Sequence, residues 1–144
     1  MNITNVLARK GPKVVTIKPD QTIRQALVLL AEHNIGALVV VDDSGAPVGI
    51  LSERDIVREA ARNETVFVKV VSSLMTTTLI LGTPSDDLVS VGTTMTDRRI
   101  RHLPIVDNNR LVGIVSLGDV MKVQCAELKG EVDTLQTQLL EEPA

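Results

Sequence analysis

Aromatic residues are almost missing from this chain. Its 144 residues contain no Trp and no Tyr, and Phe67 is the only Phe. Aromatic side chains normally supply much of the buried area of a core. The core of this protein must instead be almost purely aliphatic, built from Val, Leu and Ile.

Cysteine, positive charge and long apolar runs are also scarce. Cys125 is the only cysteine, so no internal disulfide can form, and we expect a reducing, cytoplasmic location. The net charge of −3 lacks the basic excess of a nucleic-acid binder. No apolar run reaches the ~18 residues of a membrane span, and the first residues do not form a secretory signal. Two histidines and one cysteine without close spacing predict no metal site.

The second half of the chain repeats the first. GILSERD at 49–55 corresponds to GIVSLGD at 113–119, and an offset of 65 positions aligns the segments before them. This offset matches four pairs: Pro19 with Pro84, Ile35 with Ile100, Leu38 with Leu103, and Asp42 with Asp107. A unit of about 60 residues buries too little surface to be comfortably stable alone. We therefore expect two copies packed on each other around a shared core.

Each copy predicts the same order of elements: strand, helix, strand, strand, helix. In the first copy these are a strand at 14–17, a helix from Thr22 to Asn34, strands at 37–41 and 47–51, and a helix from Ser52 to about 61. In the second copy they are a strand at 79–81, a helix at 87–98, strands at 102–106 and 111–115, and a helix capped by Ser116.

The last helix is predicted to run on towards the C-terminus. Apolar residues there alternate steps of four and three, which is the spacing of a heptad seam: Met121, Cys125, Leu128, Val132, Leu135 and Leu139. Two interpretations stay open. The helix folds back on its own body, or the seam forms a dimer contact.

The order of elements and the Gly-hydrophobic-x-Ser-x-x-Asp phrase in each copy resemble the CBS-domain pair, a regulatory module that binds adenosine nucleotides. IRHLP at 100–104 adds to the resemblance, whereas the first copy departs from it with Val39 where the second has Pro104. The resemblance implies a mixed α/β (α+β) fold of two β-α-β-β-α repeats packed as one pseudo-symmetric pair, with an extended C-terminal helix. The implied division is a first CBS domain at 7–62, a linker at 63–75, a second domain at 76–124 and a helical extension at 125–144.

Ser52 and Asp55, like Ser116 and Asp119, have a spacing that suits two kinds of chemistry. A Ser at the helix N-cap accepts a backbone N–H, and an acid three residues later reaches back to it. A capping box prefers Glu or Gln at that third position, yet both copies have the shorter Asp. A carboxylate can also accept both hydrogen bonds of a ribose cis-diol, and a helix N-terminus offers N–H groups to an anion. Capping and binding can coexist, and with the resemblance we expect binding.

The resemblance also implies two ligand clefts built crosswise, so that the Ser and Asp of one copy face strands of the other. Carried over by position, the first cleft is predicted to contain Ser52, Arg54, Asp55, Ile80, Arg101, His102 and Leu103. The second is predicted to contain Val15, Gly36, Ala37, Leu38, Ser116 and Asp119. Backbone groups near Leu38 and Leu103 would read the edge of an adenine that lies between aliphatic side chains.

The two clefts are expected to differ in charge. The first collects cationic side chains, Arg54, Arg101 and His102, with Arg98 and Arg99 nearby. The second has Gly36 and Ala37 at the positions of Arg101 and His102. Because the planar guanidinium group suits phosphate, we predict that the first cleft binds a phosphorylated ligand more tightly. For Arg98 and Arg99, a solvated helix end is the alternative.

These observations predict a regulatory protein that is not an enzyme and has no catalytic cofactor. Its ligand would be AMP, ADP, ATP or NAD(H), and its partners a second copy of the chain and a separate effector protein, with no nucleic acid and no membrane. A nucleotide-processing enzyme is the first alternative, but the chain lacks a Gly-Lys-Ser/Thr phosphate loop. Nucleic-acid binding through the C-terminal helix is the second, but acidic residues outnumber lysines there.

Overall fold

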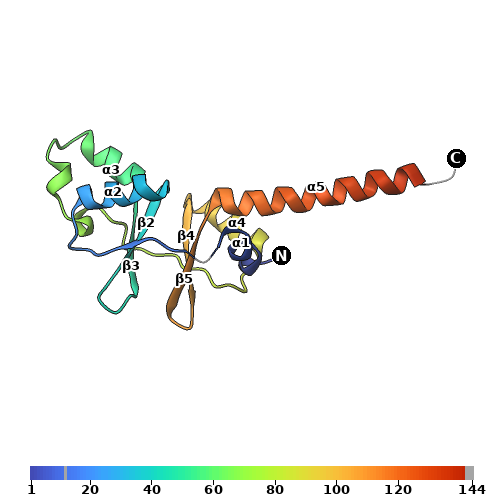
Figure 1. Cartoon of the computed structure of the whole chain (residues 1–144), viewed down its shortest axis with the longest axis horizontal. Helices are drawn as coiled ribbons and strands as arrows, with labels where there is room; N and C mark the ends of the chain where they lie inside the picture. Colours follow the sequence, from blue (N-terminus) through green and yellow to red (C-terminus); the bar gives the residue numbers. More distant parts are fainter. Residues whose placement is uncertain (12, 142–144) are drawn as a thin grey trace.

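The computed structural model describes residues 1–11 and 13–141. In chain order its elements are α1 (Ile3–Lys10), β1 (Thr16–Ile17), α2 (Ile23–His33), β2 (Ala37–Val41), β3 (Pro47–Ser52), α3 (Glu53–Ala60), two short 3-10 helices η1 (Val66–Val68) and η2 (Val71–Ser73), α4 (Leu88–Asp97), β4 (His102–Asp107), β5 (Arg110–Ser116) and α5 (Leu117–Glu141). The predicted mixed fold of two repeats with an extended C-terminal helix is confirmed. The two hairpins lie in the middle, α2 and α3 on one side, α1 and α4 on the other, and α5 projects away (Figure 1).

The first repeat forms a three-stranded sheet in which β1 runs parallel to β2 and β2 antiparallel to β3. Every residue of β2 is buried, as expected for a continuous run of aliphatic, mostly β-branched side chains. At the start of α2, Thr22 accepts a hydrogen bond from the N–H of Gln25, and the Gln25 side chain accepts one from the N–H of Thr22. A capping box therefore begins α2.

The second repeat lacks the strand predicted at 79–81. In the described residues its sheet has only β4 and β5, and the segment before α4 contributes one parallel bridge, between Gly82 and Ile105. The reason lies at Pro104, which takes the place of Val39. Val39 pairs with Thr16 in the first repeat, but proline has no N–H to extend such a ladder. The prediction at 79–81 is thus wrong because of one residue in the neighbouring strand.

The aliphatic core is divided into two clusters rather than shared as one. The first repeat's cluster includes Val66 and Val71, which come from the segment that leads into the second repeat. The second repeat's cluster includes Ile3 and Val6, which come from the segment that leads into the first. Each leading segment therefore completes the core of the other repeat, and the two repeats interlock.

Backbone hydrogen bonds follow the same exchange. The N–H groups of Ile3 and Thr4 donate to the carbonyls of Asp86 and Pro84 in the second repeat. With the repeat offset of 65 positions, these acceptors correspond to Gln21 and Pro19, which accept from the N–H groups of Val71 and Ser72. Helix α1, which the sequence analysis did not predict, is thus the counterpart of η2. In addition, Leu7 lies so close to Gly113 that a Cβ there would come within 2.6 Å of its side chain.

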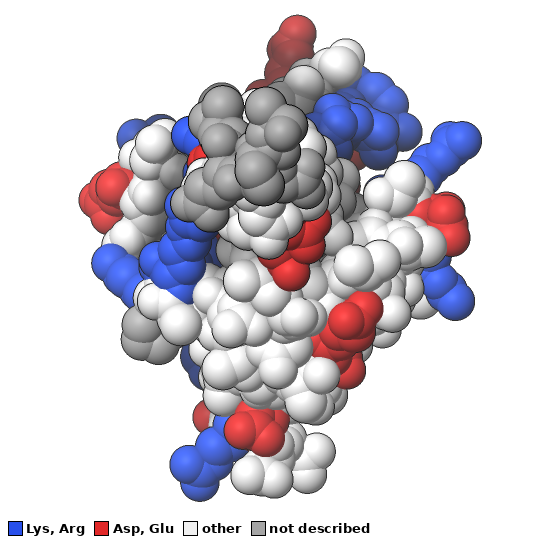
Figure 2. Space-filling view, turned by 90° about the vertical axis from the view of Figure 1, so that its right-hand side faces the viewer, with Lys and Arg blue, Asp and Glu red and all other residues white. Residues whose placement is uncertain are grey.

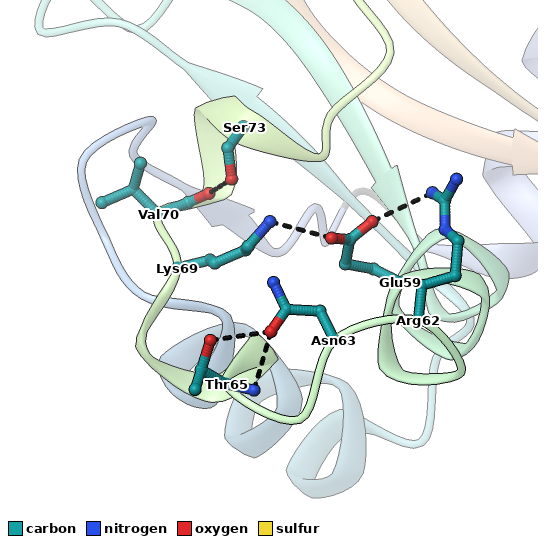
Figure 3. Close-up of polar contacts among 7 residues, drawn as sticks. All are labelled: Glu59, Arg62, Asn63, Thr65, Lys69, Val70 and Ser73. Atoms are coloured by element: carbon teal, nitrogen blue, oxygen red, sulfur yellow. Dashed lines mark hydrogen bonds and ion pairs between the residues drawn. The ribbon is translucent and has the colours of Figure 1, made fainter.

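The segment between the repeats is attached to the first repeat by side-chain contacts. Glu59, near the end of α3, accepts a hydrogen bond from Lys69 at 2.8 Å and one from Arg62 at 3.0 Å (Figure 3). The bond from Lys69 is the main reason why the pKa of Glu59 lies below its usual value. Asn63 accepts from both the N–H and the hydroxyl of Thr65 (Figure 3). The predicted linker is therefore part of the folded body.

Helix α5 leaves the body after its first two turns. Val120 and Val123 are buried in the second cluster, but the seam side chains are exposed, from 51% at Met121 to 69% at Leu139. The interpretation that this helix folds back on its own body is wrong (Figure 1). A part of the predicted extension, residues 142–144, lies outside the described residues. None of the described helices is long and apolar enough to cross a membrane.

We predict that Ile3→Ala lowers the free energy of unfolding by about 2–4 kcal/mol, because Ile3 is fully buried in the core of the second repeat. Urea denaturation followed by circular dichroism measures the change. Arg9→Ala, in the same helix but exposed, is the control and should leave stability within about 0.5 kcal/mol. A loss of similar size for both variants would show that α1 does not complete this core.

Candidate functional site

A cleft of about 330 Å³ lies between the two repeats, within the size range of small-molecule sites. We call it the first cleft. Both repeats line it: Gly36, Ile50, Ser52, Glu53, Arg54, Asp55, Arg58, Thr76, Thr78, Leu79, Ile80, Arg99, Ile100, Arg101, His102 and Pro104. The crosswise arrangement implied by the family resemblance is thus seen in the lining.

Asp55 enters this cleft from the first turn of α3. Ser52 is the last residue of β3 and caps α3: its hydroxyl accepts the N–H of Asp55 at 3.2 Å, and the Asp55 carboxylate accepts the N–H of Ser52 at 3.0 Å. The second repeat repeats this pattern, with distances of 3.0 Å and 2.8 Å between Ser116 and Asp119. The capping interpretation is therefore confirmed in both copies. Only one Asp55 oxygen takes part in the cap, and the half-buried side chain still lines the cleft.

Arg101 and His102 enter the first cleft from the other repeat. His102 begins β4 and pairs with Ser116 of β5, as Ala37 pairs with Ser52 in the first repeat. Burial, assisted by the nearby Lys10 ammonium, lowers the pKa of His102 despite the carboxylates of Asp119 and Glu53. Burial therefore disfavours a positive charge on His102, and the arginines are the stronger candidates for the cations of this cleft.

Arginines supply the positive charge of the first cleft. Four of them line it, Arg54, Arg58, Arg99 and Arg101, beside the carboxylates of Glu53 and Asp55. Arg58 follows Arg54 by four positions on α3, so the two lie on one helix face. Arg99 has a φ of 56°, in the left-handed region that few residues other than Gly, Asn and Asp adopt. At the corresponding place the first repeat has Asn34, with a φ of 50°.

The second cleft has a similar volume, about 320 Å³, but a different lining. It is formed by Lys10, Lys13, Val15, Asn34, Ile35, Gly36, Ala37, His102, Ile114, Ser116 and Asp119. Gly36 and His102 line both clefts, so the two clefts adjoin.

The Asp119 carboxylate in the second cleft forms an ion pair with Lys10. Lys10 of α1 donates to Asp119 at 2.7 Å and to the carbonyl of Ile114 at 2.8 Å. Burial alone would raise the pKa of Asp119, but the hydrogen bonds from Lys10 and Ser116 outweigh burial, and the pKa lies below its usual value. The second cleft therefore contains two lysines, Lys10 and Lys13, which a comparison of Gly36 and Ala37 with Arg101 and His102 did not predict. Lys10 is already paired with the acid.

Most residues predicted for the two clefts do line them, and two do not. Leu38 and Leu103 are buried in the cores, at 0% and 4% exposure. The side chains of a strand alternate between its faces, so residues next to cleft-lining positions point into the core. Lys10 and Lys13 were missed because the docking of α1 on the other repeat has no signal in the sequence. Thr76 and Thr78, which the sequence analysis did not assign to a cleft, also line the first cleft.

The described residues contain no group of three His, Cys, Asp or Glu that could hold a metal ion. The chemistry of the first cleft is thus that of a carboxylate at a helix N-terminus facing several guanidinium groups.

Comparison with known proteins identifies related chains. The model of the CBS domain matches residues 7–62 and 71–125. The CBS domain-containing protein YhcV of Bacillus subtilis is 42% identical over 108 residues, which cover 75% of this chain and 76% of that protein. The mitochondrial CBS domain-containing protein CBSX3 of Arabidopsis thaliana is 32% identical over 142 residues, covering 92% of this chain and 69% of that protein.

Solved structures agree with these matches. The CBS-domain containing protein ATU1752 from Agrobacterium tumefaciens superposes with a TM-score of 0.82 at 38% identity, covering 86% of this chain and 99% of the other. The CBS domain pair of protein MJ0100, solved in complex with 5'-methylthioadenosine and S-adenosyl-L-methionine, has a TM-score of 0.79 at 27% identity and covers 88% and 98% of the two chains. Two matched domains that together span most of the sequence, and a fold shared with CBS pairs, show that this chain belongs to the CBS-domain family.

Proposed function

We propose that this protein is a cytoplasmic regulatory module that binds an adenosine nucleotide, AMP, ADP, ATP or NAD(H), in the first cleft and passes its occupancy to a partner protein. The observation that carries the proposal is that the Asp55 carboxylate and four arginines line one cleft between the repeats. Binding without turnover is expected.

The first cleft offers a suitable group for each part of such a ligand. The Asp55 oxygen outside the cap can accept from ribose hydroxyls, while the N-terminus of α3 favours negative charge. Ile50, Ile80 and Pro104 supply apolar walls for the base. These contacts come from both repeats, so a bound nucleotide would bridge them.

The arginines favour a ligand that carries phosphate. Protein MJ0100 was solved with 5'-methylthioadenosine and S-adenosyl-L-methionine, neither of which has a phosphate group. Guanidinium groups donate paired hydrogen bonds to phosphate oxygens, and four of them line this cleft. We therefore infer that a nucleotide binds more tightly here than a nucleoside. At ~0.3 kcal/mol for each heavy atom, a ligand of this size would bind with micromolar affinity.

Signalling would follow from the bridge between the repeats. A ligand shifts an equilibrium only through its differential affinity for two states. A nucleotide held by α3 of the first repeat and β4 of the second binds most tightly when the repeats are in one relative orientation. Its occupancy would thus change the shape of the pair or the geometry of a dimer, which an effector protein can recognise.

The ligand can be identified directly. Since the chain has no Trp or Tyr, a copurified adenine would dominate its ultraviolet absorption, and acid extraction with mass spectrometry would name the nucleotide. We predict that Asp55→Asn, which keeps an acceptor for the cap, weakens binding by about 1.5–3 kcal/mol in calorimetry. Asp87→Asn is the control, because Asp87 caps α4 by accepting the N–H of Ser90 and does not line the first cleft. Equal affinities for Asp55→Asn and the wild type would refute the assignment of this cleft.

Arg99 offers a second test, because its backbone is strained and the residue lines the first cleft. We predict that Arg99→Asn raises the free energy of unfolding by about 0.5–1 kcal/mol, since Asn tolerates the left-handed region better. The same variant should bind the nucleotide about tenfold more weakly through loss of a guanidinium group. Thermal denaturation and calorimetry measure the two effects. Arg98→Asn, at a neighbouring position with a φ of −90°, should change neither, and a stable Arg99→Asn variant with full affinity would exclude Arg99 from the site.

The Lys10–Asp119 ion pair predicts how many nucleotides each chain binds. Because Lys10 holds the carboxylate of the second cleft, we expect one nucleotide per wild-type chain. Lys10→Met should release Asp119 and allow a second, weaker binding event in titration calorimetry. Lys13→Met is the control, because Lys13 lines the same cleft but lies outside the pair. Two equivalent sites in the wild type would contradict a closed second cleft.

A further inference from the structure

The outer part of α5 carries an apolar stripe that the folded body does not cover. Leu128, Val132, Leu135 and Leu139 are all more than half exposed, and the helix extends away from both repeats (Figure 1). An isolated helix of this length is marginal in water. A partner that buries the stripe would stabilise it.

The side chains of the seam specify which partner fits. Steps of four and three place Cys125, Val132 and Leu139 at the a positions of a heptad repeat, and Met121, Leu128 and Leu135 at the d positions. In a parallel coiled coil, a β-branched residue at a with leucine at d favours two strands over three or four. Val132, between Leu128 and Leu135, has this pattern. The side of the helix away from the seam is polar, with Glu127, Asp133, Thr134 and Thr137.

The charges beside the seam distinguish the two directions of pairing. Lys122 and Lys129 are at e positions, and Glu131 is at a g position. In a parallel pair, g faces e of the next heptad, so Lys129 would face Gln124 of the other copy and Glu131 would face Gln136. In an antiparallel pair, e faces e, and the register that centres on Lys129 would place lysine against lysine. The parallel arrangement sets Lys129 and Glu131 each opposite an uncharged glutamine.

The body surface next to the seam leaves room for such a partner. A shallow groove between α4 and α5 runs into the seam at Met121 and is lined by Val89, Gly92, Thr93, Thr96, Asp97, Leu117, Met121 and Gln124. Val89 is 64% exposed. Viewed from the end on which α5 projects, uncharged side chains make up most of the centre of this face, with acidic side chains among them (Figure 2). The first turns of a second α5 would therefore approach a mostly uncharged surface, where Asp97 is the one charged residue of the groove lining.

We propose that α5 pairs with α5 of a second copy as a parallel, in-register two-stranded coiled coil, which brings the two Cys125 side chains face to face. Residues at a pack against the same position of the other helix in this arrangement, which brings two cysteines within reach of a disulfide. An antiparallel pair would separate them. The proposal does not depend on nucleotide binding.

The lone cysteine makes the orientation measurable. Treatment of the full chain with diamide, which takes up the two thiol hydrogens, should give a disulfide-linked dimer on a non-reducing gel. Leu128→Cys in a Cys125→Ser background, at the next d position, should also cross-link. Glu127→Cys in the same background, on the outer face, is the matched control and should not.

Light scattering tests the seam independently of any disulfide. Under reducing conditions the wild-type chain should be a dimer, and the double variant Leu128→Asp/Leu135→Asp should be a monomer with an unchanged unfolding transition of the body. Thr134→Asp/Thr137→Asp, with the same added charge on the outer face, should remain a dimer. A monomeric wild type, a dimer that survives the seam substitutions, or cross-linking of Cys125 only to a cysteine placed at Leu135 would each overturn the proposal.

Discussion

The exchange of leading segments between the repeats is the contact on which the rest of this molecule depends. A unit of about 60 residues buries too little surface to be comfortably stable alone, and here each repeat receives buried side chains from outside itself. Ile3 and Val6 enter the second repeat, while Val66 and Val71 enter the first. Equivalent backbone hydrogen bonds join each segment to its host. The clefts between the repeats are lined by residues of both, so this interlocking also holds the candidate site in shape.

The same exchange makes the two clefts chemically unequal. Lys10 comes seven residues after Ile3, and Thr78 comes seven residues after Val71. Ile3 and Val71 make corresponding contacts. The segment that contains Ile3 therefore contributes Lys10 to the second cleft, and the segment that contains Val71 contributes Thr78 to the first. Lys10 forms an ion pair with the Asp119 carboxylate of the second cleft. Thr78, at the corresponding place, leaves the Asp55 carboxylate of the first cleft available. A single difference between the leading segments thus separates a candidate binding cleft from a closed one.

Divergence within the duplicated strands and helices adds to this inequality. Asn34 has become Arg99 in the second copy, in the same left-handed conformation, and Gly36 has become Arg101. Both arginines line the first cleft. Where Val39 has become Pro104, the second sheet has lost its outer strand. The two arginines concentrate positive charge in one of the two clefts.

The sequence by itself determined the duplication, the order of most elements, and the Ser and Asp that end the last strand of each copy, because local periodicity and capping need only neighbouring residues. Through its resemblance to the CBS-domain pair, the sequence also pointed to Arg54 and Arg101 as cleft residues, and both line the first cleft. Only the tertiary structure decided that the core divides in two, that Leu38 and Leu103 face inwards, that Lys10 pairs with Asp119, and that the seam of α5 is uncovered. Each of these depends on which distant segments pack together. That choice is made by shape and burial across the whole chain, and no short stretch of residues encodes it.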